Sequence, residues 1–350
     1  MSDPPEAPKG RLVRDPLNGA WTVIASRRQA RPHDPADSGF PAADRATPGP
    51  GGAAAATDCP FCEGHEHLTP PEVDALRPAG SAPDTPGWSV RVVPNKFPVF
   101  EGGHEVVVHS PRHDLPLYAQ PPAEIADVVA MYQRRVAALC AGGAAAVTVI
   151  LNHGRAAGAS LAHPHSQIFA TPIVPPVLVS ELEQFARYRV KYDRCLLCDV
   201  MRAAADEGSR LVFDGPIVAW APDASRWPYE VRLAPRAHEA DFLRAEPGVV
   251  GFALKRVLTA VAGATGDAPL NAWLHTVPCP ADAGGGAGGA GVPIEGVSGE
   301  AAPPFHWHIE VAPRLTTLAG FELGTGISID TVEPREAAAR LRAALPESVS

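Results

Sequence analysis

The sequence lacks a long apolar run that is free of polar and charged residues. Its first sixteen residues, MSDPPEAPKGRLVRDP, contain no apolar core of the kind that marks a secretory leader. The most apolar stretch, residues 125–151, is interrupted by Gln133, Arg134 and Arg135, which argues against a membrane-spanning helix. We therefore expect a cytoplasmic protein that makes no membrane contact.

The sequence also lacks an excess of positive charge. Its 39 acidic residues outnumber its 30 Lys and Arg residues, which gives a formal net charge of −9. Nucleic acids and anionic membrane surfaces attract basic proteins, so we expect neither as a partner. With 45% hydrophobic and 20% charged residues, the 350-residue chain has an ordinary globular composition and is long enough for two packed cores.

Cysteine is scarce, and disulfides are rare in the cytoplasm, so the six cysteines call for another explanation. Four of them form two CxxC pairs, at Cys59/Cys62 and Cys195/Cys198. Cys140 and Cys279 stand alone. The CxxC pairs are therefore the cysteines to which a chemical role is assigned.

Large apolar residues are few in two segments, 31–57 and 280–304, which are rich in Pro, Gly and Ala and are predicted to be flexible loops. Outside these segments, strands are predicted at 21–25, 90–94, 105–109, 147–151 and 165–170. Apolar residues at helical spacing predict a helix at 123–140, and a second helix is expected at 249–262. A third is predicted at 334–344, which has Pro near its first position and is rich in Ala.

The two halves of the chain repeat one order of motifs. Each half contains a CxxC, a strand followed by Pro-Arg and a His, a helix, a strand with an Asn, and a His-x-His. Asn152 thus has its counterpart in Asn271. This order predicts an α+β unit used twice, in domains 1–175 and 176–350.

The CxxC pairs indicate metal sites. Two nearby thiolates can bind one tetrahedral zinc, which then needs two more nitrogen or sulfur ligands, although an isolated CxxC is also compatible with a redox motif. Because the histidines recur at matching places in both halves, we predict two closed structural Zn²⁺ sites. Their ligands are Cys59, Cys62, His113 and His163, and Cys195, Cys198, His238 and His306. The third ligand of the first site stays open, since His104 and His109 compete with His113; His65 and His67 are expected to be exposed to solvent.

The segment NHGRAAGASLAHPHSQIF, residues 152–169, is predicted to bind a phosphate. Its small residues let backbone N–H groups approach an anion, although the segment has no GK[ST] and is not a P-loop. Pro164 allows His163 to face the zinc while His165 faces the phosphate. A neutral imidazole is a good nucleophile toward phosphorus, so we predict His165 as the nucleophile, with Ser160 and Gln167 donating to the phosphate oxygens. The alternative is that both histidines bind zinc.

At these residues the sequence resembles a known family. AGASLAHPHSQ is similar to the active-site signature of galactose-1-phosphate uridylyltransferases, a branch of the histidine-triad superfamily, and RDPLNGAWTVIASRRQARP, CPFC, VPNKFP, CLLC and GFELGTGISID extend the resemblance over nearly the whole chain. The resemblance implies a duplicated histidine-triad-like fold with antiparallel sheets and flanking helices, a homodimer, and ping-pong transfer through a nucleotidyl-histidine. It also implies that a nucleotide sugar and a sugar phosphate are the substrates.

The resemblance also implies substrate contacts. Those to the nucleotide and its phosphates are Arg28, Arg31, Asn95, Asn152, Gly158 and Ala159, and those to the hexose are Gly320, Phe321 and Glu322. His308, in the nucleophile's place of the second half, follows no AGAS-like loop and is expected to be structural.

Two departures leave the nucleotide base open. The second metal site of the best-known uridylyltransferases uses a carboxylate and histidines, whereas CLLC is more similar to a sister group that includes ADP-glucose:phosphate adenylyltransferases. HPHSQ also has Ser where the better-known enzymes often have Gly or Cys. UDP-glucose with galactose 1-phosphate is the default pair, and ADP-glucose with phosphate is the alternative. A nucleotide hydrolase and an inactive nucleotide-binding protein are weaker alternatives, because the GFELGTG segment and the intact HPH argue against them.

Overall fold

The computed structural model describes residues 10–30, 58–280 and 304–346. The predicted loop 31–57, with Arg31, lies outside the described residues, and so does 281–303 within the second predicted loop. The five predicted strands are all present, with ends that differ from the prediction by at most two residues. The three predicted helices are also confirmed.

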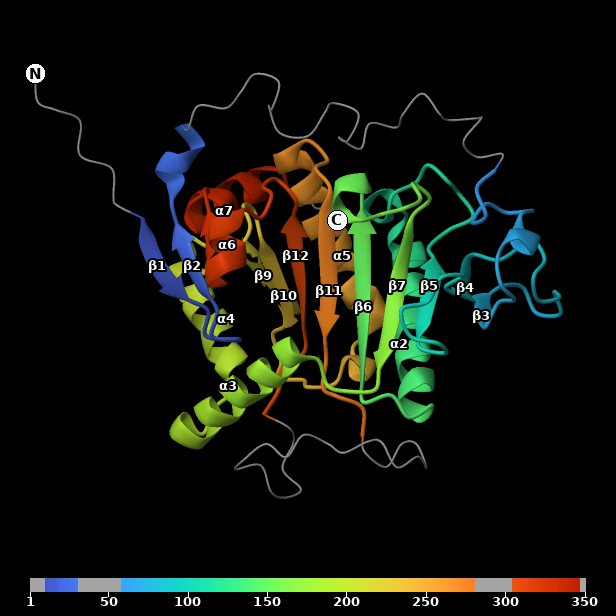
Figure 1. The fold of residues 1–350 in the computed structure, drawn as a ribbon, viewed down its shortest axis with the longest axis horizontal. Coiled ribbons are helices and arrows are strands. Elements are labelled where there is room, and N and C mark those ends of the chain that lie inside the picture. The colour runs from blue at the N-terminus through green and yellow to red at the C-terminus, as the bar shows by residue number, and fades with distance from the viewer. Residues whose placement is uncertain (1–9, 31–57, 281–303, 347–350) are drawn as a thin grey trace, which may run out of the picture.

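The centre of the fold is one ten-stranded sheet (Figure 1). Its order is β3 (Asp74–Leu76), β4 (Val90–Pro94), β5 (His104–Val108), β7 (His165–Thr171), β6 (Ala146–His153), β11 (Leu270–His275), β12 (His308–Pro313), β10 (Val231–Pro235), β9 (Ile217–Trp220) and β8 (Leu211–Phe213). All of its neighbouring strands are antiparallel. The order β4-β5-β7-β6 is mirrored by β9-β10-β12-β11, so the two repeats share a sheet through β6 and β11. The predicted α+β fold of antiparallel sheet and flanking helices is confirmed.

Two long helices cover one face of this sheet. Helix α2 (Pro122–Ala141) packs against α5 (Pro247–Thr265), and α7 (Pro334–Ala343) packs against α5 in turn. The helices cross closely at Gly251, where an added Cβ would lie 3.1 Å from the backbone nitrogen of Ala126. Their apolar faces and the sheet form the main hydrophobic core.

Helix α5 is long and apolar enough to cross a membrane by composition alone. Its buried residues include Val250, Leu254, Val257 and Val261, which pack in the core with α2 and the sheet. The contacts of α5 are therefore those of a core helix.

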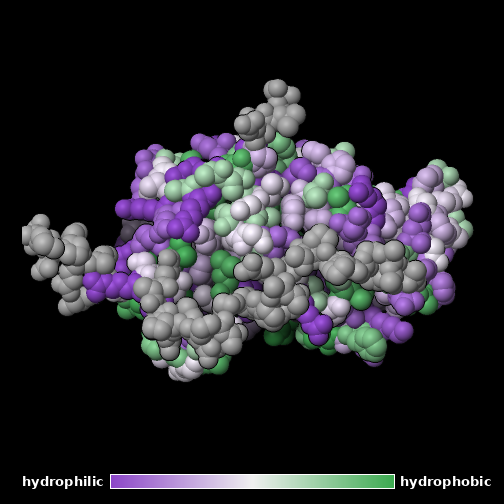
Figure 2. All heavy atoms as spheres, turned by 90° about the horizontal axis from the view of Figure 1, so that it is seen from above, coloured by the Kyte–Doolittle hydropathy of each residue, from purple (hydrophilic) through white to green (hydrophobic). Residues whose placement is uncertain are grey.

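On the face seen in Figure 2, outside the grey atoms, hydrophilic and hydrophobic residues are interspersed.

Helices α3 (Pro176–Tyr192) and α4 (Leu196–Glu207) were not predicted. The apolar residues Leu178, Leu182 and Phe185 of α3 have helical spacing and are buried in a second core cluster. Pro176 stands at the first helical position, where proline is favoured. These two signals were sufficient to predict α3. Helix α4 begins inside the second CxxC, directly after Cys195.

The N-terminal hairpin belongs spatially to the second repeat. Strands β1 (Arg11–Arg14) and β2 (Trp21–Ile24) form a three-stranded sheet with β13 (Ser328–Asp330), which runs parallel to β2. The turn between β1 and β2 places Asp15 against Arg232 of β10, with Arg232 Nη1 donating to Asp15 Oδ1 at 3.0 Å. Both residues are 1% exposed. The hairpin β1–β2 and the C-terminal strand β13 therefore lie together beside the second repeat.

We expect Arg232→Ala to lower the free energy of unfolding by about 3–5 kcal/mol, the typical result of removing one partner from a buried ion pair. The carboxylates of Asp15, Glu230 and Glu310 all lie close to this guanidinium and would lose it. Denaturant unfolding measures the change. The control is Arg187→Ala, whose side chain is 70% exposed in its pair with Glu183, and for which we expect at most about 1 kcal/mol. Equal effects of the two variants would contradict the prediction.

The two cysteines outside the CxxC pairs, to which the sequence assigned no role, are joined in a disulfide. Cys140 lies at the end of α2 and Cys279 follows β11, and their Cα atoms are 5.2 Å apart. The backbone N–H of Cys279 donates to the carbonyl of Ala145, which brings the two segments to the same edge of the sheet. The sequence did not indicate this pair because 139 residues separate the two cysteines, and only the shared sheet brings them together.

Candidate active site and metal centres

The HPH segment leads into β7, which lies between β5 and β6 in the sheet. Its two histidines are fixed by different backbone carbonyls. His165 Nδ1 lies 2.7 Å from the carbonyl oxygen of His163, so this nitrogen carries the proton and donates. The lone pair of the ring is then on Nε2. Burial lowers the pKa of His165 below its usual value, which keeps the ring neutral near pH 7.

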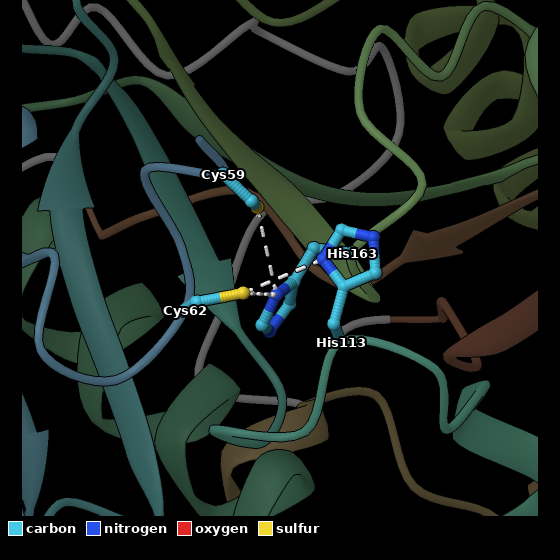
Figure 3. Close-up of side chains that lie close together, drawn as sticks. All are labelled: Cys59, Cys62, His113 and His163. Carbon is cyan, nitrogen blue, oxygen red and sulfur yellow. Dashed lines mark hydrogen bonds between the residues drawn. The ribbon is translucent and has the colours of Figure 1, made fainter. Parts of the chain in front are cut away.

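The first predicted metal site is assembled from three segments, which carry the CxxC pair, His113 and His163 (Figure 3). Sγ of Cys62 lies 3.5 Å from His113 Nδ1 and 3.6 Å from His163 Nδ1, and Sγ of Cys59 lies 3.7 Å from His163 Nδ1. Zinc with Zn–S bonds of about 2.3 Å and Zn–N bonds of about 2.1 Å at tetrahedral angles requires S···N separations of about 3.6 Å. The four residues therefore fit zinc without rearrangement.

The tautomer of His163 also suits a metal ligand. Its Nε2 lies 2.8 Å from the carbonyl oxygen of Ser110, so Nε2 donates and Nδ1 presents its lone pair to the sulfur atoms. Burial lowers the pKa of His163 to about 4, which keeps the ring neutral.

The competing histidines lie outside this cluster. His109 Nε2 contacts Ser166 Oγ at 2.8 Å and Tyr132 Oη at 3.0 Å in the core behind β7. His65, expected to be exposed, is half-buried, and its Nδ1 donates to the carbonyl of Cys59 at 2.8 Å. His67 is exposed as expected. His113 is therefore the third ligand that the geometry supports.

The second predicted site repeats the first. Sγ of Cys198 lies 3.5 Å from His306 Nδ1 and 3.9 Å from His238 Nδ1, and Sγ of Cys195 lies 3.6 Å from His306 Nδ1. His306 Nε2 donates to the carbonyl of Pro235 at 3.0 Å, as His163 does to Ser110 in the first site. These residues fit a second zinc by the same test.

A third buried cluster was not predicted. It comprises Glu181, His275, His308 and Glu310, whose possible ligand atoms lie within 4.8 Å of one another. His275 Nδ1 donates to Glu181 at 2.9 Å. Burial lowers the pKa of His308, but the carboxylates of Glu181 and Glu310 outweigh burial and raise it to about 9.

This cluster already balances its charges without an ion, because Arg226 and Arg232 also pair with Glu310. His308 is fully buried, which agrees with a structural role. The alternation of His308 and Glu310 on one strand face was the signal in the sequence. Glu181 belongs to the unpredicted helix α3.

The predicted phosphate loop forms a tight turn after β6. Gly154 and Gly158 have φ of 81° and 89°, a region that favours glycine. The backbone N–H groups of Ala157, Gly158 and Ala159 donate to carbonyls of the loop itself. The loop therefore holds its own shape with these three donors, whereas the prediction had them facing an anion.

Gln167 and Asn95 both lie against His104, a contact that the sequence did not predict. The backbone N–H of Val99 donates to His104 Nδ1 at 3.2 Å, so the proton of His104 is on Nε2. Nε2 donates in turn to Gln167 Oε1 at 2.8 Å, which leaves the NH₂ group of Gln167 to face elsewhere. Asn95 Nδ2 lies 3.1 Å from the same nitrogen, which donates to Gln167 and so cannot also accept from Asn95; Asn95 is held instead by its Oδ1, which accepts from the N–H of Phe97. His104, considered only as a zinc ligand, thus orients a predicted phosphate contact.

The chain is similar to known proteins over most of its length. The family model for the N-terminal domain of galactose-1-phosphate uridyl transferase matches residues 96–175, which include the phosphate loop and HPH. ADP-glucose phosphorylase of Arabidopsis thaliana is 28% identical over 359 residues, covering 95% of this chain and 92% of the relative. Galactose-1-phosphate uridylyltransferase of Thermotoga maritima is 27% identical over 348 residues, covering 95% and 97%. Over nearly its whole length the chain is therefore similar to galactose-1-phosphate uridylyltransferases and to an ADP-glucose phosphorylase.

Solved structures of the family share the fold. The crystal structure of the Arabidopsis thaliana ADP-glucose phosphorylase with bound ADP-glucose has a TM-score of 0.76 at 27% identity, covering 95% of this chain and 99% of that one. A uridylyltransferase structure has a TM-score of 0.66 at 28% identity, covering 97% and 99%. Because these relatives are named as uridylyltransferases and an ADP-glucose phosphorylase, we conclude that the chain is a nucleotidyltransferase.

Some predicted family contacts lie away from β7 in this chain. Gly320, Phe321 and Glu322 belong to α6 (Gly320–Thr325), and Phe321 is 45% exposed. Figure 1 shows α6 on the other side of β6, β11 and β12 from β7. Arg28 is exposed in the turn Ser26–Ala30, which follows β2 in the three-stranded sheet on that same side. The structure therefore separates the residues predicted to bind substrate into two groups.

Proposed function

We propose that this nucleotidyltransferase moves a nucleoside monophosphate from a nucleotide sugar to a second phosphate by ping-pong chemistry, through a covalent intermediate on His165. The observation that carries the proposal is the bond from His165 Nδ1 to the carbonyl of His163, since it leaves a neutral ring with its lone pair on Nε2. Such a ring is both a nucleophile and a tolerable leaving group.

In the first step the Nε2 lone pair forms a bond to the α-phosphorus, and the bond from phosphorus to the hexose phosphate oxygen breaks. That oxygen leaves with the electron pair. In the second step an oxygen of the acceptor phosphate attacks the same phosphorus, and the P–N bond breaks to restore the lone pair. The proton on Nδ1 stays in place in both steps. Asn152, Ser160 and Gln167 donate hydrogen bonds to the non-bridging oxygens.

We also propose that the chain binds two Zn²⁺ ions. Cys59, Cys62, His113 and His163 would hold one ion, and Cys195, Cys198, His238 and His306 would hold the other. Each site offers four protein ligands and no open position, so zinc supplies rigidity rather than Lewis-acid chemistry. His163 then fixes the carbonyl that orients His165.

The substrate pair has two candidates. UDP-glucose with galactose 1-phosphate is the default, as in the relatives named galactose-1-phosphate uridylyltransferase. ADP-glucose with inorganic phosphate is favoured by the second Cys/His cluster and by the TM-score of 0.76 to the ADP-glucose phosphorylase, against 0.66 to the uridylyltransferase. Both pairs use the same chemistry at His165.

The proposal includes a homodimer. If Arg28 and Glu322 contact the substrate that His165 attacks, they come from a second copy, because one chain places them away from β7. In the single chain the Glu322 carboxylate accepts from the N–H of Ala319 at the start of α6.

One labelling experiment tests the chemistry and the base together. The protein is incubated separately with UDP-glucose and ADP-glucose, each radiolabelled in the α-phosphate, then quenched and separated from free nucleotide. We expect acid-labile label on the protein from one donor, released by the matching acceptor. Absence of label from both donors would rule out the covalent intermediate, and the donor that labels the protein identifies the base.

A further inference from the structure

The two repeats meet at a pair of asparagines. Strands β6 and β11 are antiparallel neighbours, and their register places Asn152 directly opposite Asn271. These are the asparagines that occupy matching places in the two halves of the sequence. Asn152 lies near the end of β6, one residue before the turn at Gly154, whereas Asn271 is the second residue of β11.

The hydrogen bonds of Asn271 fix the orientation of both amides. Asn271 Nδ2 donates to the carbonyl oxygen of Ala157 at 2.8 Å. A carbonyl oxygen only accepts, so the NH₂ group of Asn271 must face the loop. The same nitrogen lies 2.8 Å from the side chain of Asn152, which must then present its oxygen, Oδ1. The NH₂ group of Asn152 is thereby turned away from Asn271.

The NH₂ group of Asn152 lies near the loop. A Cβ added to Gly158 would lie 3.9 Å from Asn152 Nδ2, with no other atom closer. The backbone N–H groups of Ala157, Gly158 and Ala159 are occupied within the loop. With these three N–H groups engaged, the Nδ2 of Asn152 is a side-chain donor available to an anion beside Gly158.

We propose that Asn271 is a positioning residue, which holds the Asn152 amide with its NH₂ group toward Gly158, where it donates to a phosphate oxygen of the nucleotide. The inference rests on the proposed function in one respect, namely that the loop binds the phosphates of a nucleotide. Asn271 also fixes the Ala157 carbonyl on the side away from the anion. The second repeat thus contributes one residue to the phosphate site of the first.

A double-mutant cycle tests the proposal in the full-length protein. Asn152→Ala removes the donor, and Asn271→Ala removes its orientation. We expect each to lower kcat/KM for the nucleotide sugar, by about 10- to 100-fold for Asn152→Ala, as for a lost hydrogen bond to a charged group, and by less for Asn271→Ala. The double variant should match Asn152→Ala alone, because Asn271 acts through Asn152.

Binding of ADP and of UDP, measured by calorimetry, repeats the cycle without turnover. Failure of the proposed function would appear as no turnover with either donor pair, whereas the positioning role is judged on diphosphate binding. The control is Ala272→Gly, which perturbs the same strand at a buried position and should lower the melting temperature while leaving KM and diphosphate affinity unchanged. This control separates general weakening of β11 from loss of amide orientation.

Three results would overturn the proposal. They are wild-type diphosphate affinity in Asn271→Ala, wild-type affinity in Asn152→Ala, and a double variant whose loss equals the product of the two single losses. The last result would mean that Asn271 acts independently of Asn152.

Discussion

Replacing His165 with asparagine should lower kcat by about 10⁴-fold or more, the scale on which removing a nucleophile acts. Asparagine carries an amide nitrogen near the position of His Nδ1, so the hydrogen bond to the His163 carbonyl is retained. It has no atom at the position of Nε2, so the bond to phosphorus cannot form. The variant should therefore keep its fold and its affinity for the nucleotide sugar.

Turnover with UDP-glucose and with ADP-glucose, together with protein labelling, measures the effect. The matched control is His67→Asn, an exposed histidine near the first CxxC, which should turn over at the wild-type rate. Label that persists in His165→Asn, or turnover within tenfold of wild type, would contradict nucleophilic catalysis by His165.

The two Cys/His clusters were predictable from the sequence because tetrahedral coordination restricts both residue type and spacing. Two thiolates three positions apart and a histidine before a strand leave few arrangements, and the repeat supplied an independent copy of each. The choice of His113 over His104 and His109 depended on that repeat, and of the three it is His113 that the structure brings together with Cys59, Cys62 and His163. The strands were predictable for a similar reason, since their β-branched runs are bounded by turn residues.

The features that were missed depend on contacts between distant segments. Cys140 and Cys279 meet because α2 and β11 end at the same edge of the sheet. Glu181 of α3 lies 2.9 Å from His275 Nδ1 of β11 and 3.8 Å from His308 Nε2 of β12, residues far from it in the sequence. Neither contact leaves a periodic pattern in the sequence. Asn271 was noted as a counterpart of Asn152, but only the strand register shows that the two side chains touch.

The predicted phosphate loop differs from the prediction in its backbone donors. Gly154 and Gly158, two of the small residues on which the prediction rested, both have positive φ. The donors differ, because three backbone N–H groups close the loop on itself. A sequence shows which backbone can bend, whereas the partner of each N–H depends on the exact path of the turn.

Loss of the first CxxC motif and loss of the second should have different effects on activity. Cys59→Ser and Cys195→Ser each remove one thiolate from a closed site, so we expect zinc content to fall from two ions per chain to one in either variant. Metal binding contributes directly to folding free energy, and we expect each melting temperature to fall by on the order of 10 °C. Zinc content by elemental analysis and melting by calorimetry measure these changes.

Activity should separate the two variants. His163 is a proposed ligand of the first site, and its carbonyl accepts the hydrogen bond from His165 Nδ1. Releasing His163 from the metal therefore frees the group that orients the nucleophile, and Cys59→Ser should lose activity well below its melting temperature. His306 has the same relation to His308, but His308 is buried between two carboxylates and faces no phosphate loop. Cys195→Ser should therefore retain most of its activity at temperatures where it is folded. Equal losses of activity at equal fractions folded would show that the first site does not position His165.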